Sequence, residues 1–289
     1  MSPIRNPFLP DGTVPHVIIL FYRVCRCVWF LPMTTAMLCL SATGCGSRTY
    51  EARLQETANY FRYLDTLNQN LQEEWRGSGI QVRVPKQFEL MPAPPKPAAD
   101  KAGEEPAAGE EPLHDPRQPD YLEFEIPGLV AAWKAVVDVD DRDAGVPAYV
   151  YIASNYPMWL EDGGAKRAVR LHEDFAAQLA GALGKQLPDP NEWSEETFPP
   201  RGKKGYVSRK AYTSITLTPD RPIQGVITDF TIYLYKVQDI QIVILTVIPR
   251  DVGRRENLKE RIALCLETLK VSGEKPSRPN EPGGSSVGF

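Results

Sequence analysis

The chain has 289 residues and a formal net charge of −4, and residues 45–289 have room for one domain of ordinary size plus flexible segments. That part carries 30 basic and 36 acidic side chains, because Arg5, Arg23, Arg26 and Asp11 precede it and the whole chain has 33 and 37. An acidic balance argues against nucleic acid as a partner, since phosphates demand a basic face.

The first 45 residues have the order of a secretory signal. Arg23 and Arg26 precede an apolar run, and small residues at 42–44 lead to Cys45. This order resembles a bacterial lipoprotein signal peptide. The resemblance implies that residues 1–44 are removed, that Cys45 carries the lipid (palmitate or another acyl chain), and that the protein is anchored to a membrane of the cell envelope on its periplasmic side.

Two alternatives to a lipid anchor stay open. An uncleaved single-pass anchor would use residues 28–44, which are at the short limit for a span. A cleaved, soluble form is the other. A second apolar patch at 17–21 stands ahead of the arginines and favours a true start further along the chain.

Residues 45–79 are expected to form a tether and an amphipathic helix. Apolar side chains recur every three or four positions from Tyr50 to Arg76, and Gly77-Ser78-Gly79 is expected to end the helix. Such a helix is a tethered stalk or packs on its own domain. An oligomeric coiled coil needs three or more heptads, a length that this helix barely reaches.

A single domain is expected over residues 80–271, interrupted by an insertion at 92–119. The insertion is rich in Pro, Ala and Glu and has no aromatic residue, so it cannot bury enough apolar surface to offset the cost of ordering. We therefore predict that it is disordered. The same prediction applies to the Pro-, Gly- and Ser-rich tail, 272–289.

Hydrophobic periodicity predicts the elements of this domain. Strands are expected at 80–84, 121–126, 132–137, 148–152, 206–217, 227–235 and 240–248, with 132–152 and 227–248 as hairpins. The last strand is apolar on both faces, as a central strand is. Helices are expected at 165–183, ended by Gly184, and at 254–269.

This order predicts an α+β fold, a largely antiparallel sheet covered by helices and preceded by the amphipathic helix. It resembles the PsbP-like α/β/α sandwich of extrinsic photosystem II proteins and of a nuclear-import accessory protein. The carrying features are Val82-Arg83-Val84-Pro85 with Phe88, the two hairpins, the helix 165–183 and the closing helix ending Thr268-Leu269. The resemblance covers most of 80–271 and transfers no functional residue.

The densest acidic group is Asp138, Asp140, Asp141 and Asp143. A calcium loop that began at Asp138 would have Arg142 at its third ligand position and Ala144 at its glycine site, so the motif fails. We interpret the group as a solvated hairpin tip, and no metal site is predicted.

Other candidate groups have structural interpretations. His172 is expected to be an exposed helix histidine, because no Gly-x-Ser-x-Gly turn accompanies it and His114 falls in the insertion. Cys265, the only cysteine after Cys45 in the sequence, is expected in the core. Gly202-Lys203-Lys204-Gly205, with Arg201, Arg209 and Lys210, could meet anionic headgroups or serve solubility. The many Trp and Tyr residues are expected mainly in the core, with a partner groove between 156 and 212 as the lesser alternative.

Two functions remain. The favoured one is a lipid-anchored, non-catalytic binding or assembly module with an envelope protein as its partner, and with no catalytic, cofactor-binding or metal residues. The alternative is an envelope hydrolase that uses carboxylates alone, with Asp162, Glu173 or Asp229 as candidates. It would need two carboxylates facing one cleft at roughly 5–10 Å.

Overall fold

The computed structural model describes residues 47–94, 115–140, 144–202 and 205–276, and the chain divides into two units, 1–63 and 64–289. A helix occupies residues 47–70. In the first unit its apolar side chains Tyr50, Leu54 and Phe61 are exposed. In the second unit Leu67 is buried. The predicted signal and Cys45 lie outside the described residues.

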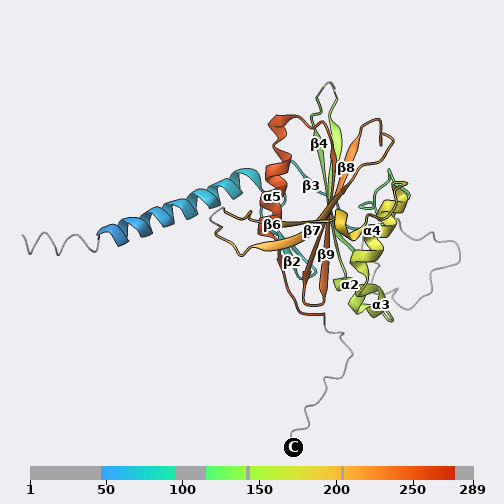
Figure 1. Ribbon diagram of the computed structural model, residues 1–289, viewed down its shortest axis with the longest axis horizontal. Helices are drawn as coiled ribbons and strands as arrows, with labels where there is room; N and C mark the ends of the chain where they lie inside the picture. The colour runs from blue at the N-terminus through green and yellow to red at the C-terminus, as the bar shows by residue number, and fades with distance from the viewer. Residues whose placement is uncertain (1–46, 95–114, 141–143, 203–204, 277–289) are drawn as a thin grey trace, which may run out of the picture. The chain divides into compact units, whose positions relative to one another are not determined.

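The second unit is built on a seven-stranded antiparallel sheet (Figure 1) with the order β3-β4-β5-β9-β8-β7-β6. Its strands are β3 (Glu89–Leu90), β4 (Leu129–Val137), β5 (Val146–Ser154), β6 (Ser194–Phe198), β7 (Lys210–Leu217), β8 (Thr228–Val237) and β9 (Ile240–Pro249). Both predicted hairpins are present, β4–β5 and β8–β9. The edge strand β6 was not predicted from the sequence, because its residues Ser194-Glu195-Glu196-Thr197 are polar.

A second, three-stranded sheet has the order β1-β2-β10, with β1 (Trp75–Gly77), β2 (Ile80–Val82) and β10 (Lys270–Val271). It corrects the predicted end of the first helix, which stops at residue 70 instead of 76. Ser78 and Gly79 have φ of 47° and 73°, and Gly77 pairs with Ile80. Two such residues make the tight turn that suits a hairpin, so the Gly-Ser-Gly run joins two strands.

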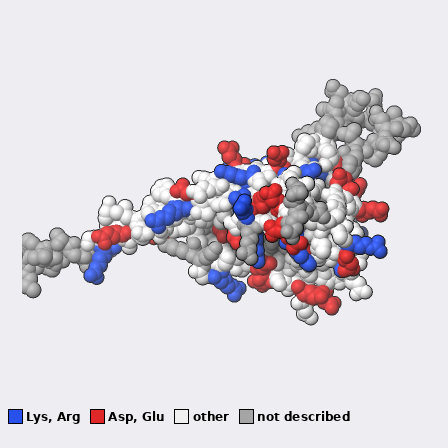
Figure 2. Space-filling model, turned by 90° about the horizontal axis from the view of Figure 1, so that it is seen from above, with Lys and Arg blue, Asp and Glu red and all other residues white. Residues whose placement is uncertain are grey.

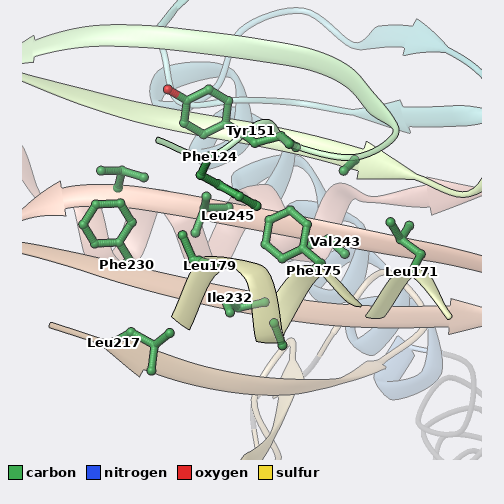
Figure 3. Packing of buried hydrophobic residues seen from close by; sticks show 14 of the residues in the cluster. Phe124, Tyr151, Leu171, Phe175, Leu179, Leu217, Phe230, Ile232, Val243 and Leu245 are labelled. Atoms are coloured by element: carbon green, nitrogen blue, oxygen red, sulfur yellow. The ribbon is translucent and has the colours of Figure 1, made fainter. Parts of the chain in front are cut away.

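One face of the large sheet is covered by α2 (Tyr156–Leu160), α3 (Ala165–Ala168) and α4 (Leu171–Ala182). The predicted single helix 165–183 is thus broken near Val169, and Gly184, with φ of 67°, follows its end as expected. Figure 3 shows side chains of α4 and of the central strands, Phe175 and Leu179 with Val243 and Leu245, in one buried cluster.

The opposite face is covered by α5 (Leu258–Thr268), which follows a single turn, η3 (Arg254–Glu256). Figure 1 shows α4 and α5 on opposite sides of the sheet. The Tyr212 hydroxyl of β7 donates to the Leu266 carbonyl oxygen of α5, 2.8 Å away. Ile242 and Ile244 of β9 are buried, and so are Val243 and Leu245 on the α4 side. The expectation that β9 is covered on both faces is confirmed.

The segment between β3 and β4 departs from the prediction in two ways. Residues 121–126 form no strand, although Phe124 and Ile126 are buried against the α4 cluster. Residues 115–119 were placed in the disordered insertion, yet Arg117 donates to the Val130 carbonyl oxygen at 2.9 Å and pairs with Asp115. Alternating apolar residues here reflect burial without strand pairing. The remainder of the insertion, 95–114, lies outside the described residues.

The surface carries charges of both signs. Figure 2 shows acidic and basic side chains intermingled over the face in view, so the charge on that face is mixed. Among the described residues, no helix is both long and apolar enough to cross a bilayer.

Candidate functional site

The α5-covered side of the sheet has an open groove of about 720 Å³, which we call the threonine groove. Its floor is formed by β7, β8 and β9, and the first half of α5 forms one wall. The residues used below are Glu196, Thr216, Asp229, Thr231, Tyr233, Thr246 and Arg250, with Leu258, Lys259 and Glu260 on the wall.

Three aligned threonines form the centre of the floor. Thr216 pairs with Thr231 across β7 and β8, and Thr231 pairs with Thr246 across β8 and β9. Paired residues of neighbouring strands project to the same face, so the three side chains form a row. The Thr216 and Thr231 hydroxyl oxygens are 2.9 Å apart, and Thr246 is buried. Each hydroxyl can donate and accept, so the row suits a polar ligand or partner.

An ion pair flanks the row on one side, two residues from Thr231 along β8. The Arg250 Nη2 atom donates to Asp229 Oδ1 at 3.0 Å and to the Thr218 hydroxyl at 2.7 Å, and that hydroxyl donates to Asp229 Oδ1 at 2.6 Å. The three side chains therefore hydrogen-bond to one another. Asp229, one of the predicted carboxylate candidates, is therefore a partner in a structural pair.

Glu196 and Tyr233 flank the row on the other side, Tyr233 two residues from Thr231 along β8. The Ser214 hydroxyl donates to Glu196. Burial, and then the neighbouring Glu196 carboxylate, raise the pKa of Tyr233 to about 12. The phenol is consequently neutral at physiological pH and keeps its proton for donation.

The two strand carboxylates of the groove are too far apart to act as an acid–base pair. Glu196 pairs with Tyr212, and Ser214, two residues on, pairs with Tyr233. Glu196 therefore shares a row with Tyr235, six residues from Asp229 on β8. The Glu196 carboxylate reaches the Ser214 hydroxyl, whose row meets β8 at Tyr233, four residues from Asp229. Four residues of strand span ~13 Å, whereas a carboxylate pair in a hydrolase needs roughly 5–10 Å.

The three predicted carboxylates are not brought together. Glu173 lies on α4 and pairs with Arg170 at 3.8 Å. Asp162 is exposed between α2 and α3. Both therefore belong to the helical layer on the α4 face, whereas Asp229 lines the groove on the α5 face.

His172 is not the exposed residue that the sequence predicted. It is partly buried, and its Nε2 atom lies 3.0 Å from the Ile242 carbonyl oxygen, which can only accept. Its backbone N–H donates to the Gln241 side chain at 3.0 Å. Burial lowers the pKa of His172 to about 4, helped by nearby Lys236, so the ring is neutral at physiological pH. These contacts join α4 to β9 and give His172 a structural role.

Of the remaining candidate residues, some are buried in the domain and others lie outside the described part of the chain. Cys265 is in the core as predicted, and burial raises the pKa of its thiol to about 12. Lys210 of the expected basic cluster is buried and donates to the Glu267 carbonyl oxygen at 2.7 Å. Residues predicted as candidates that lie outside the described part of the chain are Cys45, His114, Asp141, Asp143, Lys203 and Lys204.

In the ranges that the structure describes, no group of three or more His, Cys, Asp and Glu side chains could hold a metal ion. Trp133, Tyr151 and Tyr212 are fully buried, as the core interpretation of the aromatic residues predicts. The Tyr121 and Tyr151 hydroxyl oxygens are 2.9 Å apart inside the α4 cluster.

The threonine row was not predicted from the sequence. Thr231 lies in a strand whose burial alternates, whereas Thr246 lies in β9, which is buried almost throughout. The register between strands decides whether the three align, and register was not readable from the sequence.

Comparison with known proteins identifies no family for this chain. No family model matches the chain, and no curated protein matches it. Twelve chains of solved structures match. One is a crystal structure of a protein from Bacteroides thetaiotaomicron, with 11% identity and a TM-score of 0.28, covering 70% of this chain and 48% of that one. This chain thus spans about half the length of that protein, and so low a score supports no statement about function.

Proposed function

We propose that this chain is a lipid-anchored, non-catalytic binding or assembly module of the bacterial cell envelope. Lipid on Cys45 holds it to the membrane on the periplasmic side, and the threonine groove is its binding surface for an envelope protein. The finer fold assignment, a PsbP-like sandwich, belongs to the same proposal. Helices on both faces of an antiparallel sheet support it.

The observation that carries the binding role is the composition of the groove. Its floor carries the hydroxyls of Thr216 and Thr231 beside the buried Thr246, and its two strand carboxylates are ~13 Å apart along the strands, with Asp229 already paired to Arg250. Such a surface can form hydrogen bonds to a partner, and its two strand carboxylates do not face one reacting bond as an acid and a base. This favours a binding module over the hydrolase alternative.

Site-specific photo-crosslinking in native membranes tests the binding role. A photoreactive phenylalanine analogue at Thr231, in the groove, is expected to yield a discrete crosslinked partner. The matched control places the same analogue at Gln178, an exposed position of α4 on the other side of the sheet, and is expected to yield no such adduct. Equal adducts from both positions, or none from Thr231, would contradict the assignment of the groove.

A further inference from the structure

The first unit presents an apolar stripe along its helix. The exposed fractions of Tyr50, Leu54 and Phe61 are 64%, 51% and 58%. At ~100° per residue these three side chains lie within an arc of ~40°. Large apolar side chains gathered in this way on an exposed surface usually mark a place of contact.

The residues that precede the helix indicate that a membrane surface lies within its reach. The apolar run 28–44 and Cys45 end immediately before the helix, whose first described residue is Ser47. A lipid on Cys45 or a span through 28–44 would each hold the first helical turn at the bilayer interface. Two residues reach at most ~7 Å.

The charges on the helix also suit a membrane surface. On the same helical projection, Arg53 lies ~60° from one edge of the apolar stripe and Arg62 ~80° from the other edge, next to Glu51, and Ala52 and Glu56 lie on the far side. Arginines in these positions extend their charged ends into the headgroup layer while the stripe enters the interface.

A second copy of the chain is a weaker occupant. In a heptad arrangement the core positions of the first unit would be Tyr50, Leu54, Thr57 and Phe61, which cover about two heptads and include a polar residue. A stable coiled coil needs three or more heptads of apolar core positions.

We propose that the helix 47–63 lies in the headgroup region of the membrane, with Tyr50, Leu54 and Phe61 turned into the interface. The inference rests on the proposed function, because it requires the chain to be held at a membrane. It adds a second, non-covalent contact with lipid beside the anchor.

Fluorescence quenching by lipid tests this contact in the full-length protein, reconstituted into phosphatidylethanolamine–phosphatidylglycerol vesicles that contain nitroxide-labelled lipid. An environment-sensitive thiol dye is attached at Leu54→Cys or Phe61→Cys, in a background where Cys25, Cys27 and Cys39 are Ser. Cys265 is buried and does not compete for the dye. The matched controls are Ala52→Cys and Glu56→Cys on the far side.

Nitroxide lipid is expected to reduce the fluorescence at Leu54 and Phe61 at least twofold more than at the two controls. Equal quenching at all four positions in a vesicle-bound protein would overturn the inference alone. Disulfide-linked dimers through Leu54→Cys would overturn it in favour of a second copy. A protein that does not stay with the vesicles would overturn the proposed tether as well, so the two failures are distinguishable.

Discussion

At the scale of single residues, His172 shows how its surroundings set the charge of a side chain. The imidazole Nε2 atom donates to the Ile242 carbonyl oxygen, and Gln241 holds the backbone beside it. Removing the ring from water penalises the imidazolium, and Lys236 adds repulsion, so the pKa is lowered to about 4 from 6.5. The neutral ring is therefore part of the folded structure.

This shift predicts a pH-dependent part of the stability. Because the folded pKa lies below the unfolded one, the contribution of His172 is fully present above pH ~6.5 and is lost as the pH falls toward ~4. In His172→Gln, which retains an N–H donor without titrating there, the loss of unfolding free energy between pH 7.5 and 4.5 should be about 2 kcal/mol smaller. Urea midpoints at the two pH values measure it. Parallel profiles for wild type and variant would contradict the structural role.

At the scale of elements, β9 is the strand whose side chains are buried on both faces of the sheet, with α4 covering one face and α5 the other. Val243 and Leu245 lie in the α4 cluster, and Ile242 and Ile244 are buried on the face that α5 covers. A strand in the middle of a sandwich has no solvent face, which explains why Ile240–Pro249 is almost continuously apolar.

Truncating a side chain on either face of β9 should therefore lower the free energy of unfolding. Ile244→Ala and Leu245→Ala are each expected to lower the unfolding free energy by ~2–5 kcal/mol, because each opens a cavity in a packed layer. Val136→Ala on β4 is the control, since that side chain is 68% exposed and its loss should change stability by less than ~0.5 kcal/mol. Urea unfolding gives all three values. If one of the β9 variants is silent, only one layer is packed.

At the scale of the whole molecule, the proposed protein has three parts: a lipid anchor, a helix that contacts lipid and a domain that binds a partner. Each part has its own sequence character: an apolar run ending at Cys45, a helix with one apolar stripe, and a sheet with two buried faces. The anchor is the part on which the others depend, because both proposed contacts require the chain to be in the envelope.

Removal of the anchor should release the molecule. Stable tethering needs more than one acyl chain, at ~0.8 kcal/mol per buried CH₂, so Cys45→Ala is expected to lose the acyl mass and to leave the membrane fraction or become mislocalised. Cys265→Ala, a core variant of the second unit, should stay in the membrane fraction. Fractionation with mass spectrometry of the N-terminal peptide reads both properties. Unchanged mass and fractionation in Cys45→Ala would contradict the lipid anchor.

The sequence by itself determined most element types and the side that each buries. Periodicities of about 3.6 and 2 residues are local properties, so α5 with Cys265, both long hairpins and the two-sided β9 were predictable. The same rules misassigned Trp75 to a helix and 121–126 to a strand, because an apolar pattern signals burial without naming the partner that supplies it.

Only the tertiary structure decided the candidate site. The alignment of Thr216, Thr231 and Thr246 depends on the register of three strands, and the pairing of Asp229 depends on Arg250, which lies beyond the next strand. The burial of His172 depends on β9, some 70 residues further along the chain. These are contacts between distant segments, and no local periodicity encodes them.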